Sequence, residues 1–301
     1  MYAVIAAVSR TLFDKLFPFR RGLGPIVDHS PLRWLRSPET TRSVVTADGV
    51  ALIVYPNELI GRHLVLTGQF DQTTIDVLRL VLRPNDVLLD VGANIGYVSA
   101  SLLHLVDDLE VVAVEPLPML HPLLQANLEP YDGRVRIVEA ALSTQVADGV
   151  VARDDRNLGA SRLVGEHEHE HVALAQREDV QLIDGEALVR LAGLDRVDVI
   201  KIDVEGHESE VVVTLAPWLQ PLGTRAVLFE CHEGYLAPSE PTHRLLVDAG
   251  FHLFGVRKML TRVELVDFET VDAAAATSMR IRDVLAVDVE TAAVLAERID
   301  R

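Results

Sequence analysis

A short apolar segment that passes through a glycine-containing loop into a helix is the feature that most constrains the fold of this chain. Residues 87–91 have the apolar pattern of a buried strand, and residues 90–96 spell Asp-Val-Gly-Ala-Asn-Ile-Gly. Apolar residues then recur at helical spacing from Ile95 to Val106. Because the chain must turn sharply between strand and helix, it needs positions without bulky side chains, and Gly92 and Gly96 supply them.

The same alternation of strand and helix continues along the chain. Further strands are expected at residues 111–115, 135–139, 197–203, 225–231, 251–256, 263–268 and 284–287. Helices are expected between them, at residues 117–128, 208–218, 242–249 and 289–299. This order predicts an α/β fold with a doubly wound, Rossmann-like sheet.

Two regions depart from this alternation. Before residue 68 the sequence predicts an extension at residues 1–67, with an amphipathic helix at 5–17, a linker and a β-hairpin around Asp48-Gly49. The main domain then covers residues 68–301, with an insertion at about 141–183, where Asp, Gly, Glu and His are frequent. The apolar face of the N-terminal helix needs a partner, for which we consider the main domain, another copy in a homo-oligomer, or a membrane interface.

Composition excludes several classes of protein. The formal net charge of the 301 residues is -17, which argues against a nucleic-acid partner, because gripping phosphates requires a basic face. The single cysteine excludes a disulfide within the chain. No apolar run approaches the roughly 20 residues that a transmembrane helix needs. We therefore expect a cytoplasmic protein without a transmembrane segment.

The loop at residues 90–96 has the properties of a nucleoside site. Its glycines follow a Gly-x-x-x-Gly spacing, unlike the Gly-x-Gly-x-x-Gly of dinucleotide-binding loops. Asp90 would repel a pyrophosphate but attract a ligand with amino and sulfonium groups. Glu115, at the end of the second strand, suits the two hydroxyls of a ribose. Glu139, after the third strand, is a candidate for an adenine edge, with a solvated acid as the alternative.

A second sequence segment makes the interpretation of the nucleoside site more specific. Residues 201–206 spell Lys-Ile-Asp-Val-Glu-Gly, and together with the loop they resemble the FkbM family of class I S-adenosylmethionine-dependent methyltransferases. The resemblance spans roughly residues 68–287, and Asp71 replaces a glutamate that often ends a Gly-x-Tyr-Glu segment there. It implies a seven-stranded methyltransferase sheet, S-adenosyl-L-methionine as cofactor, and O-methylation of a sugar or polyketide-type natural product. The implied cofactor residues are Asp90, Gly92, Ala93, Asn94, Gly96, Glu115, Pro116, Glu139 and Ala140.

Catalytic candidates lie after the fourth and fifth strands. Four side chains there are able to orient a hydroxyl group and accept its proton: Asp203, Glu205, Glu230 and His232. The histidine has the most suitable unperturbed pKa for a base near neutrality. The same groups are suitable ligands for Mg²⁺ or Mn²⁺, although we favour a metal-free reaction. In the structural alternative the two acids after the fourth strand cap the next helix, and Lys201 forms a salt bridge with one of them.

Other interpretations stay open at this point. The alternating histidines at residues 165–171 suggest either a metal site or a solvated hairpin, and we favour the hairpin. A nicotinamide or flavin oxidoreductase would share the fold class, and a non-catalytic partner protein could retain the cofactor pocket. Aromatic residues make up 5% of the chain, which favours a sugar or aliphatic alcohol as the small-molecule acceptor.

Overall fold

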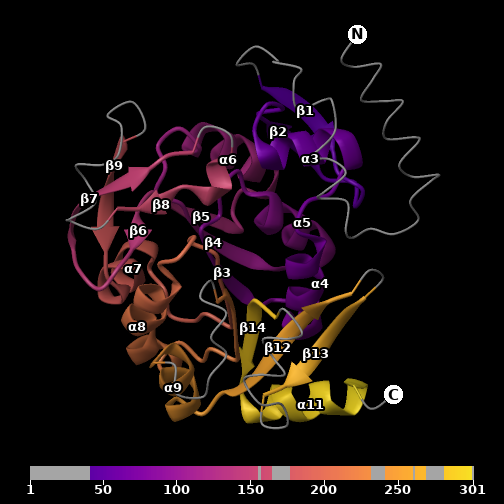
Figure 1. Cartoon of the computed structure of the whole chain (residues 1–301), viewed down its shortest axis with the longest axis vertical. Coiled ribbons are helices and arrows are strands. Elements are labelled where there is room, and N and C mark those ends of the chain that lie inside the picture. Colours follow the sequence, from indigo (N-terminus) through magenta and orange to yellow (C-terminus); the bar gives the residue numbers. More distant parts are fainter. Residues whose placement is uncertain are drawn as a thin grey trace.

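The computed structural model describes residues 41–154, 157–164, 177–231, 241–259, 262–268 and 281–299 (Figure 1). Three of the sequence-based predictions fall outside these residues: the N-terminal amphipathic helix, the histidine-rich run at 165–171, and His232. In the described part of the chain, no helix is long and apolar enough to cross a membrane.

The main sheet is mixed and has eight strands among the described residues, in the order β13-β12-β14-β11-β10-β3-β4-β5. The parallel strands are β3 (Val87–Val91), β4 (Glu110–Val114), β5 (Val135–Val138), β10 (Val199–Ile202) and β11 (Ala226–Glu230). The antiparallel strands are β12 (His252–Lys258), β13 (Val263–Asp267) and β14 (Asp283–Val287). The predicted α/β class is confirmed. The sheet has one strand more than the seven that the family resemblance implied, because β13, expected from the sequence at residues 263–268, pairs with β12.

Helices cover both faces of this sheet, as a doubly wound fold requires. Figure 1 shows one set on one side and a second set on the other. The first set is α4 (Gln72–Val81), α5 (Tyr97–Leu105) and α6 (His121–Leu128). The second set is α7 (Gly185–Ala192), α8 (Glu208–Leu219) and α9 (Pro241–Asp248), while α11 (Val289–Ile299) follows the last strand.

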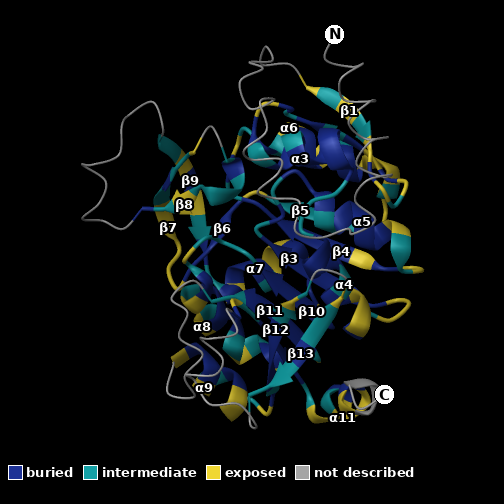
Figure 2. Ribbon diagram, turned by 45° about the vertical axis from the view of Figure 1, so that its right-hand side comes forward, coloured by how far each residue is buried: buried dark blue, intermediate teal, exposed yellow. Residues whose placement is uncertain are grey.

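The core has two halves because successive side chains of a strand point to opposite faces. In β3, Leu88 belongs to the apolar cluster with α5 and α6, whereas the adjacent Leu89 belongs to the cluster with α7 and α8. Both leucines are at most 1% exposed. The central strands of the main sheet are therefore buried on both faces, which Figure 2 shows as a dark blue centre.

The predicted hairpin is present as β1 (Arg42–Val45) and β2 (Ala51–Val54), which pair antiparallel. Asn127 of α6 holds it to the main domain. Its side-chain oxygen accepts from the amide of Ile53 at 2.6 Å, and its side-chain nitrogen donates to the carbonyls of Ile53 and Ile95 at 3.0 and 2.7 Å. Helix α3 (Leu59–Thr67) follows the hairpin.

The region predicted as an insertion forms a sheet of its own. Its strands are β6 (Ala141–Leu142), β7 (Ala147–Ala152), β8 (Arg162–Leu163) and β9 (Arg177–Ile183), in the order β6-β9-β7-β8. The short helix η3 (Leu158–Ala160) lies between β7 and β8 and contacts α3. The insertion and the N-terminal region thus meet at the edge where the parallel strands end.

Candidate active site

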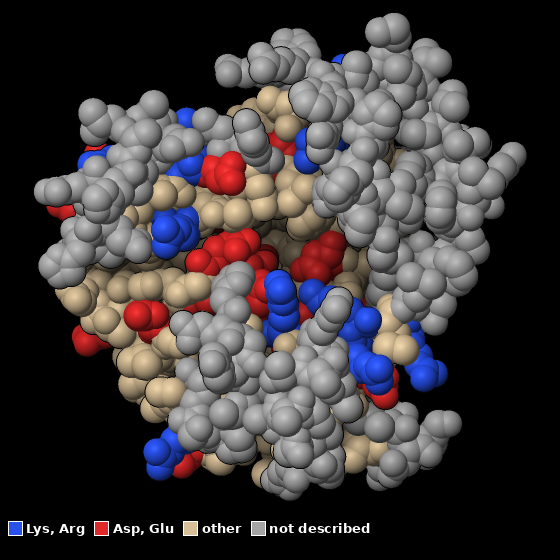
Figure 3. Space-filling view, viewed as in Figure 1, with Lys and Arg blue, Asp and Glu red and all other residues tan. Residues whose placement is uncertain are grey.

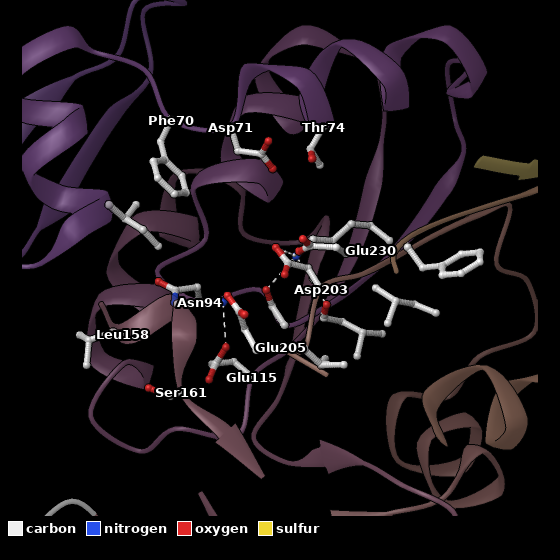
Figure 4. A pocket seen from close by; sticks show the side chains of 18 of the residues that line it. Phe70, Asp71, Thr74, Asn94, Glu115, Leu158, Ser161, Asp203, Glu205 and Glu230 are labelled. Atoms are coloured by element: carbon white, nitrogen blue, oxygen red, sulfur yellow. Dashed lines mark hydrogen bonds and ion pairs between the residues drawn. The ribbon is translucent and has the colours of Figure 1, made fainter. Parts of the chain in front are cut away.

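A cavity of about 500 Å³ opens at the carboxyl ends of β3, β4, β10 and β11, and α3, α4 and η3 complete its walls (Figure 4). In open α/β sheets, ligands bind outside the carboxyl ends of the strands. The volume lies within the range of roughly 300–1,000 Å³ that small-molecule sites occupy. Residues from the glycine loop at 90–96 and from the segment at 201–206 line this cavity.

The glycine loop owes its shape to a close approach between β3 and β10. Gly92 has a φ of 79°, and a Cβ placed on it would lie 1.9 Å from the carbonyl oxygen of Asp203. Gly96 has a φ of 80° and caps the start of α5. Asn94 also adopts a left-handed conformation, with a φ of 52°, and lines the cavity. Any side chain at residue 92 would therefore separate the two strand ends that form the floor of the site.

Asp90 lies behind the loop, where no solvent reaches it. Its carboxylate accepts a hydrogen bond from Ser99 Oγ at 2.5 Å and pairs with Lys201 Nζ at 2.9 Å, and it does not line the cavity in the described structure. Lys201 stands beside it in the register of the parallel strands and also donates to the carbonyl of Gly92 at 2.8 Å. Asp90 thus lies behind the cavity, where it can hold the loop in position, and the ligand contact expected from its place in the sequence stays a prediction.

Lys201 supplies the positive charge that pairs with the buried Asp90 carboxylate. Burial acts to lower the pKa of Lys201, but the carboxylates of Asp90 and Asp203 outweigh burial and raise it. The salt bridge predicted for Lys201 is present, with Asp90 as the near partner and Asp203 at 3.9 Å.

Glu115 is held rigidly at the cavity wall. It is 4% exposed, its Oε2 accepts from the amide of Asn94 at 2.8 Å, and its Oε1 accepts from the amide of Leu117 at 2.9 Å. Burial raises the pKa of Glu115, while these hydrogen bonds act in the opposite direction. A carboxylate has about four acceptor positions. Each oxygen therefore keeps capacity for one more donor, such as a ligand hydroxyl.

The other predicted cofactor residues divide into two groups. Pro116 and Ala140 line the cavity, whereas Ala93, Gly96 and Glu139 do not. The Glu139 side chain is 48% exposed and pairs outside the cavity with Gln125 and His121. Its position after β5 brought it to the correct edge of the sheet, but its side chain points to the protein surface.

Three acidic residues predicted as catalytic candidates lie together in the cavity: Asp203, Glu205 and Glu230. Burial raises the pKa of Asp203, Lys201 lowers it, and nearby carboxylates, Asp71 first among them, raise it further. Glu205 has a left-handed φ of 54°, a conformation that costs energy for a residue other than glycine. Figure 4 shows Asp203 and Glu230 close to each other, with Glu205 beside them.

Glu208 accepts hydrogen bonds from the loop that carries Asp203 and Glu205. Its carboxylate accepts from the amide of Val204 at 3.2 Å and from the amide of Gly206 at 2.9 Å. The sequence also allowed a capping role for Asp203 and Glu205. The loop amides are bonded instead by an acid in the first turn of α8, and the two candidates face the cavity.

Four ionisable cavity residues were not identified from the sequence, and Asp71 was noted there only as the replacement of a family glutamate. The four are His63, His207, Lys258 and Asp283. Lys258 Nζ pairs with Asp283 Oδ2 at 2.8 Å. The search followed the carboxyl ends of strands, whereas antiparallel pairing brings the start of β14 to the same edge as the end of β12. Burial lowers the pKa of His207, against the influence of Glu210 and Glu208, so its ring is neutral near pH 7.

No group of three or more His, Cys, Asp or Glu side chains within the described ranges is arranged to hold a metal ion. The histidine-rich run lies outside those ranges.

Comparison with known proteins shows a matching family model and several proteins of similar sequence. Residues 90–233 match the methyltransferase FkbM domain. The chain is similar to the hexuronic acid methyltransferase AglP of Haloferax volcanii, with 32% identity over 177 residues, which are 58% of this chain and 68% of that protein. It is also similar to the 2-O-methyltransferase NoeI of Sinorhizobium fredii, with 28% identity over 147 residues, which are 45% of this chain and 60% of that protein.

Among solved structures, the precorrin-6Y C5,15-methyltransferase of Geobacter metallireducens aligns with a TM-score of 0.38 and 13% identity, over 72% of this chain and 88% of that one. Both the glycine loop and the segment at residues 201–206 lie inside the matched domain. The chain belongs to the FkbM family of methyltransferases.

Proposed function

We propose that the protein is an S-adenosylmethionine-dependent O-methyltransferase that acts on a hydroxyl of a small molecule, either a sugar or a polyketide-type compound. The observation that carries the proposal is the presence of Asp203, Glu205 and Glu230 in the same cavity as the glycine loop and Glu115. Two relatives are named for hexuronic acid and 2-O-methylation, which supports a sugar hydroxyl.

The cavity fits the cofactor that the family implies. Glu115 presents a fixed carboxylate for ribose hydroxyls, and Pro116, Ala140 and Leu142 provide apolar surface beside it. Gly92 and Gly96, which both have positive φ values, carry no side chain at the two ends of the loop. When bound there, S-adenosylmethionine supplies an electrophilic methyl group.

The protein must place the acceptor oxygen in line with that methyl group and remove the hydroxyl proton. Holding two reactants in near-attack geometry supplies much of an enzyme's acceleration. We assign the role of base to Asp203, because it lines the cavity close to Glu230. Its pKa is raised by partial burial and by nearby carboxylates, against the influence of Lys201, which makes this carboxylate a better base. Glu205 and Glu230 would accept hydrogen bonds from neighbouring hydroxyls and orient the acceptor. His232 remains a second candidate for the base.

The test compares the wild-type chain with Asp203→Asn. With a panel of glycosides and ¹³C-methyl-labelled cofactor, the wild type should yield a product with a new O-methyl signal. A positioned base contributes typically ~10²–10⁴ in rate, so the variant should lose about 100-fold or more in kcat while still binding S-adenosylhomocysteine.

Asp195→Asn is the matched control, because Asp195 is exposed and lies outside the cavity. An unchanged kcat in Asp203→Asn would exclude Asp203 as the base. Labelled methyl groups found only on nitrogen or carbon would refute the proposed O-methylation.

A further inference from the structure

The cavity carries an excess of negative charge. Six carboxylates and two ammonium groups line it, so its described lining has a formal charge of -4: Asp71, Glu115, Asp203, Glu205, Glu230 and Asp283 against Lys201 and Lys258. Figure 3 shows acidic side chains gathered in the central hollow of this face. Both lysines are already paired with carboxylates. S-adenosylmethionine carries a sulfonium, an ammonium and a carboxylate, so it would offset only part of this excess.

Asp71 brings a carboxylate to the wall opposite Asp203. It precedes α4 at the N-cap position, but its side chain makes no capping hydrogen bond. Its φ of 41° is left-handed, a conformation that aspartate tolerates better than most residues. Figure 4 shows the carboxylate directed into the space between Phe70 and Thr74, towards Asp203 and Glu230. The Asp71 carboxylate therefore does not cap α4 and is directed into the cavity.

Gln72 adds to the wall beside Asp71 a buried hydrogen-bond acceptor without a partner among the described residues. The residue lines the cavity and is 7% exposed. Its Nε2 donates to Asp76 Oδ1 at 3.1 Å, whereas its buried Oε1 has no partner in the described structure. A buried carbonyl oxygen without a donor is costly, and native structures rarely leave one unsatisfied. The wall beside Asp71 therefore holds an acceptor that the described residues leave unsatisfied.

We propose that the acceptor is an amino sugar whose ammonium group binds between Asp71 and the Asp203–Glu230 side of the cavity. This inference rests on the proposed O-methyltransferase function and specifies its substrate class. An ammonium group offers three donors and a positive charge to walls built from acceptors. A uronic acid would instead add a carboxylate to a site with excess negative charge, and juxtaposed like charges are strongly unfavourable.

The electrostatic environment agrees with this geometry. The charge of Asp71 acts to raise the pKa of Asp203, Lys258 and Asp283, three ionisable groups that line the cavity. A cation held among these carboxylates would reduce their mutual repulsion.

The experiment measures binding to the full chain saturated with S-adenosylhomocysteine. Three methyl glycosides of one hexose are titrated by calorimetry: the 2-amino sugar, its uncharged 2-acetamido form, and the corresponding uronate. We expect the amino sugar to bind about tenfold or more tightly than the acetamido sugar, and the uronate to bind most weakly. In Asp71→Asn, which suits the left-handed backbone, the preference for the amino sugar should fall about tenfold.

Asp195→Asn removes one negative charge outside the cavity and should leave all three affinities unchanged. Equal binding of the amino and acetamido sugars, tighter binding of the uronate, no binding of the amino sugar, or an unaltered preference in Asp71→Asn would each overturn the inference. Transfer of the labelled methyl group is measured separately. The expected binding order without transfer to any sugar would refute the O-methyltransferase proposal, whereas transfer without the binding order would refute only the amino-sugar assignment.

Discussion

Glu58 makes the stability of the cavity wall dependent on pH. It is 2% exposed, caps the N-terminus of α3 and accepts a hydrogen bond from the amide of Gly61. Burial raises the pKa of Glu58 from 4.5 to about 7, although backbone hydrogen bonds and Arg62 oppose the rise. Its Oε2 is buried without a partner in the described structure. Because α3 lines the cavity and contacts η3, ionisation of Glu58 weakens an element of the site.

The size and sign follow from proton linkage. Between pH 4.5 and about 7 the folded state holds a proton on Glu58 that the unfolded state has released, so stability falls as pH rises through this window. At 1.36 kcal/mol for each pKa unit, the raised pKa corresponds to about 3 kcal/mol of stability, present below pH 4.5 and lost above pH 7. Glu58→Gln keeps an acceptor for Gly61 and removes the titration.

Urea unfolding of the wild type and Glu58→Gln at pH 5 and pH 8 measures this effect. Because the titration is incomplete at both pH values, the wild type should lose about 2.5 kcal/mol more than the variant between them. Glu186→Gln is the control, because Glu186 is an exposed acid in the first turn of α7. Parallel pH dependences in wild type and Glu58→Gln would refute the reasoning.

Two further predictions concern the loop. Gly92→Ala should destabilise the protein by about 1–3 kcal/mol or more, because its Cβ would meet the Asp203 carbonyl at 1.9 Å; thermal unfolding measures this. Gly133→Ala separates the clash from backbone strain, since Gly133 has a similar φ of 85° and open space, and equal losses in both variants would contradict the clash. Lys201→Met should cost about 3–5 kcal/mol in urea unfolding, because it leaves the Asp90 carboxylate buried without its cation. Adding Asp90→Asn should recover part of this loss, and additive losses would exclude the coupling.

The fold was largely predictable because its signals are local. The alternation of apolar strands with helices predicted the α/β sheet, and Asp48-Gly49 predicted the hairpin, in which Gly49 adopts a φ of 91°. The anchoring of that hairpin by Asn127 was not predictable, because it joins residues 74 positions apart through one side chain. The four-stranded sheet of the insertion was also missed, since β6 and β8 have two residues each and β7 and β9 have charged residues in their first halves.

The sequence predicted which strand ends carry the site residues, but it did not predict the directions of their side chains. Asp203, Glu205 and Glu230 reach the cavity, as expected for residues at the carboxyl edge. Asp90 and Glu139 are at the same edge but point elsewhere, one towards Lys201 and the other towards the surface. Such directions depend on neighbouring strands and helices, which a single sequence does not specify.

Calorimetric titration of S-adenosylhomocysteine and NAD tests the cofactor site most directly. The wild type should bind S-adenosylhomocysteine and not NAD, and Glu115→Ala should weaken this binding about tenfold or more, because charge-assisted hydrogen bonds to the ribose are lost. Glu139→Ala removes an acid outside the cavity and should bind like the wild type. Binding of NAD, or wild-type affinity in Glu115→Ala, would contradict a methyl-donor site built on the glycine loop and Glu115.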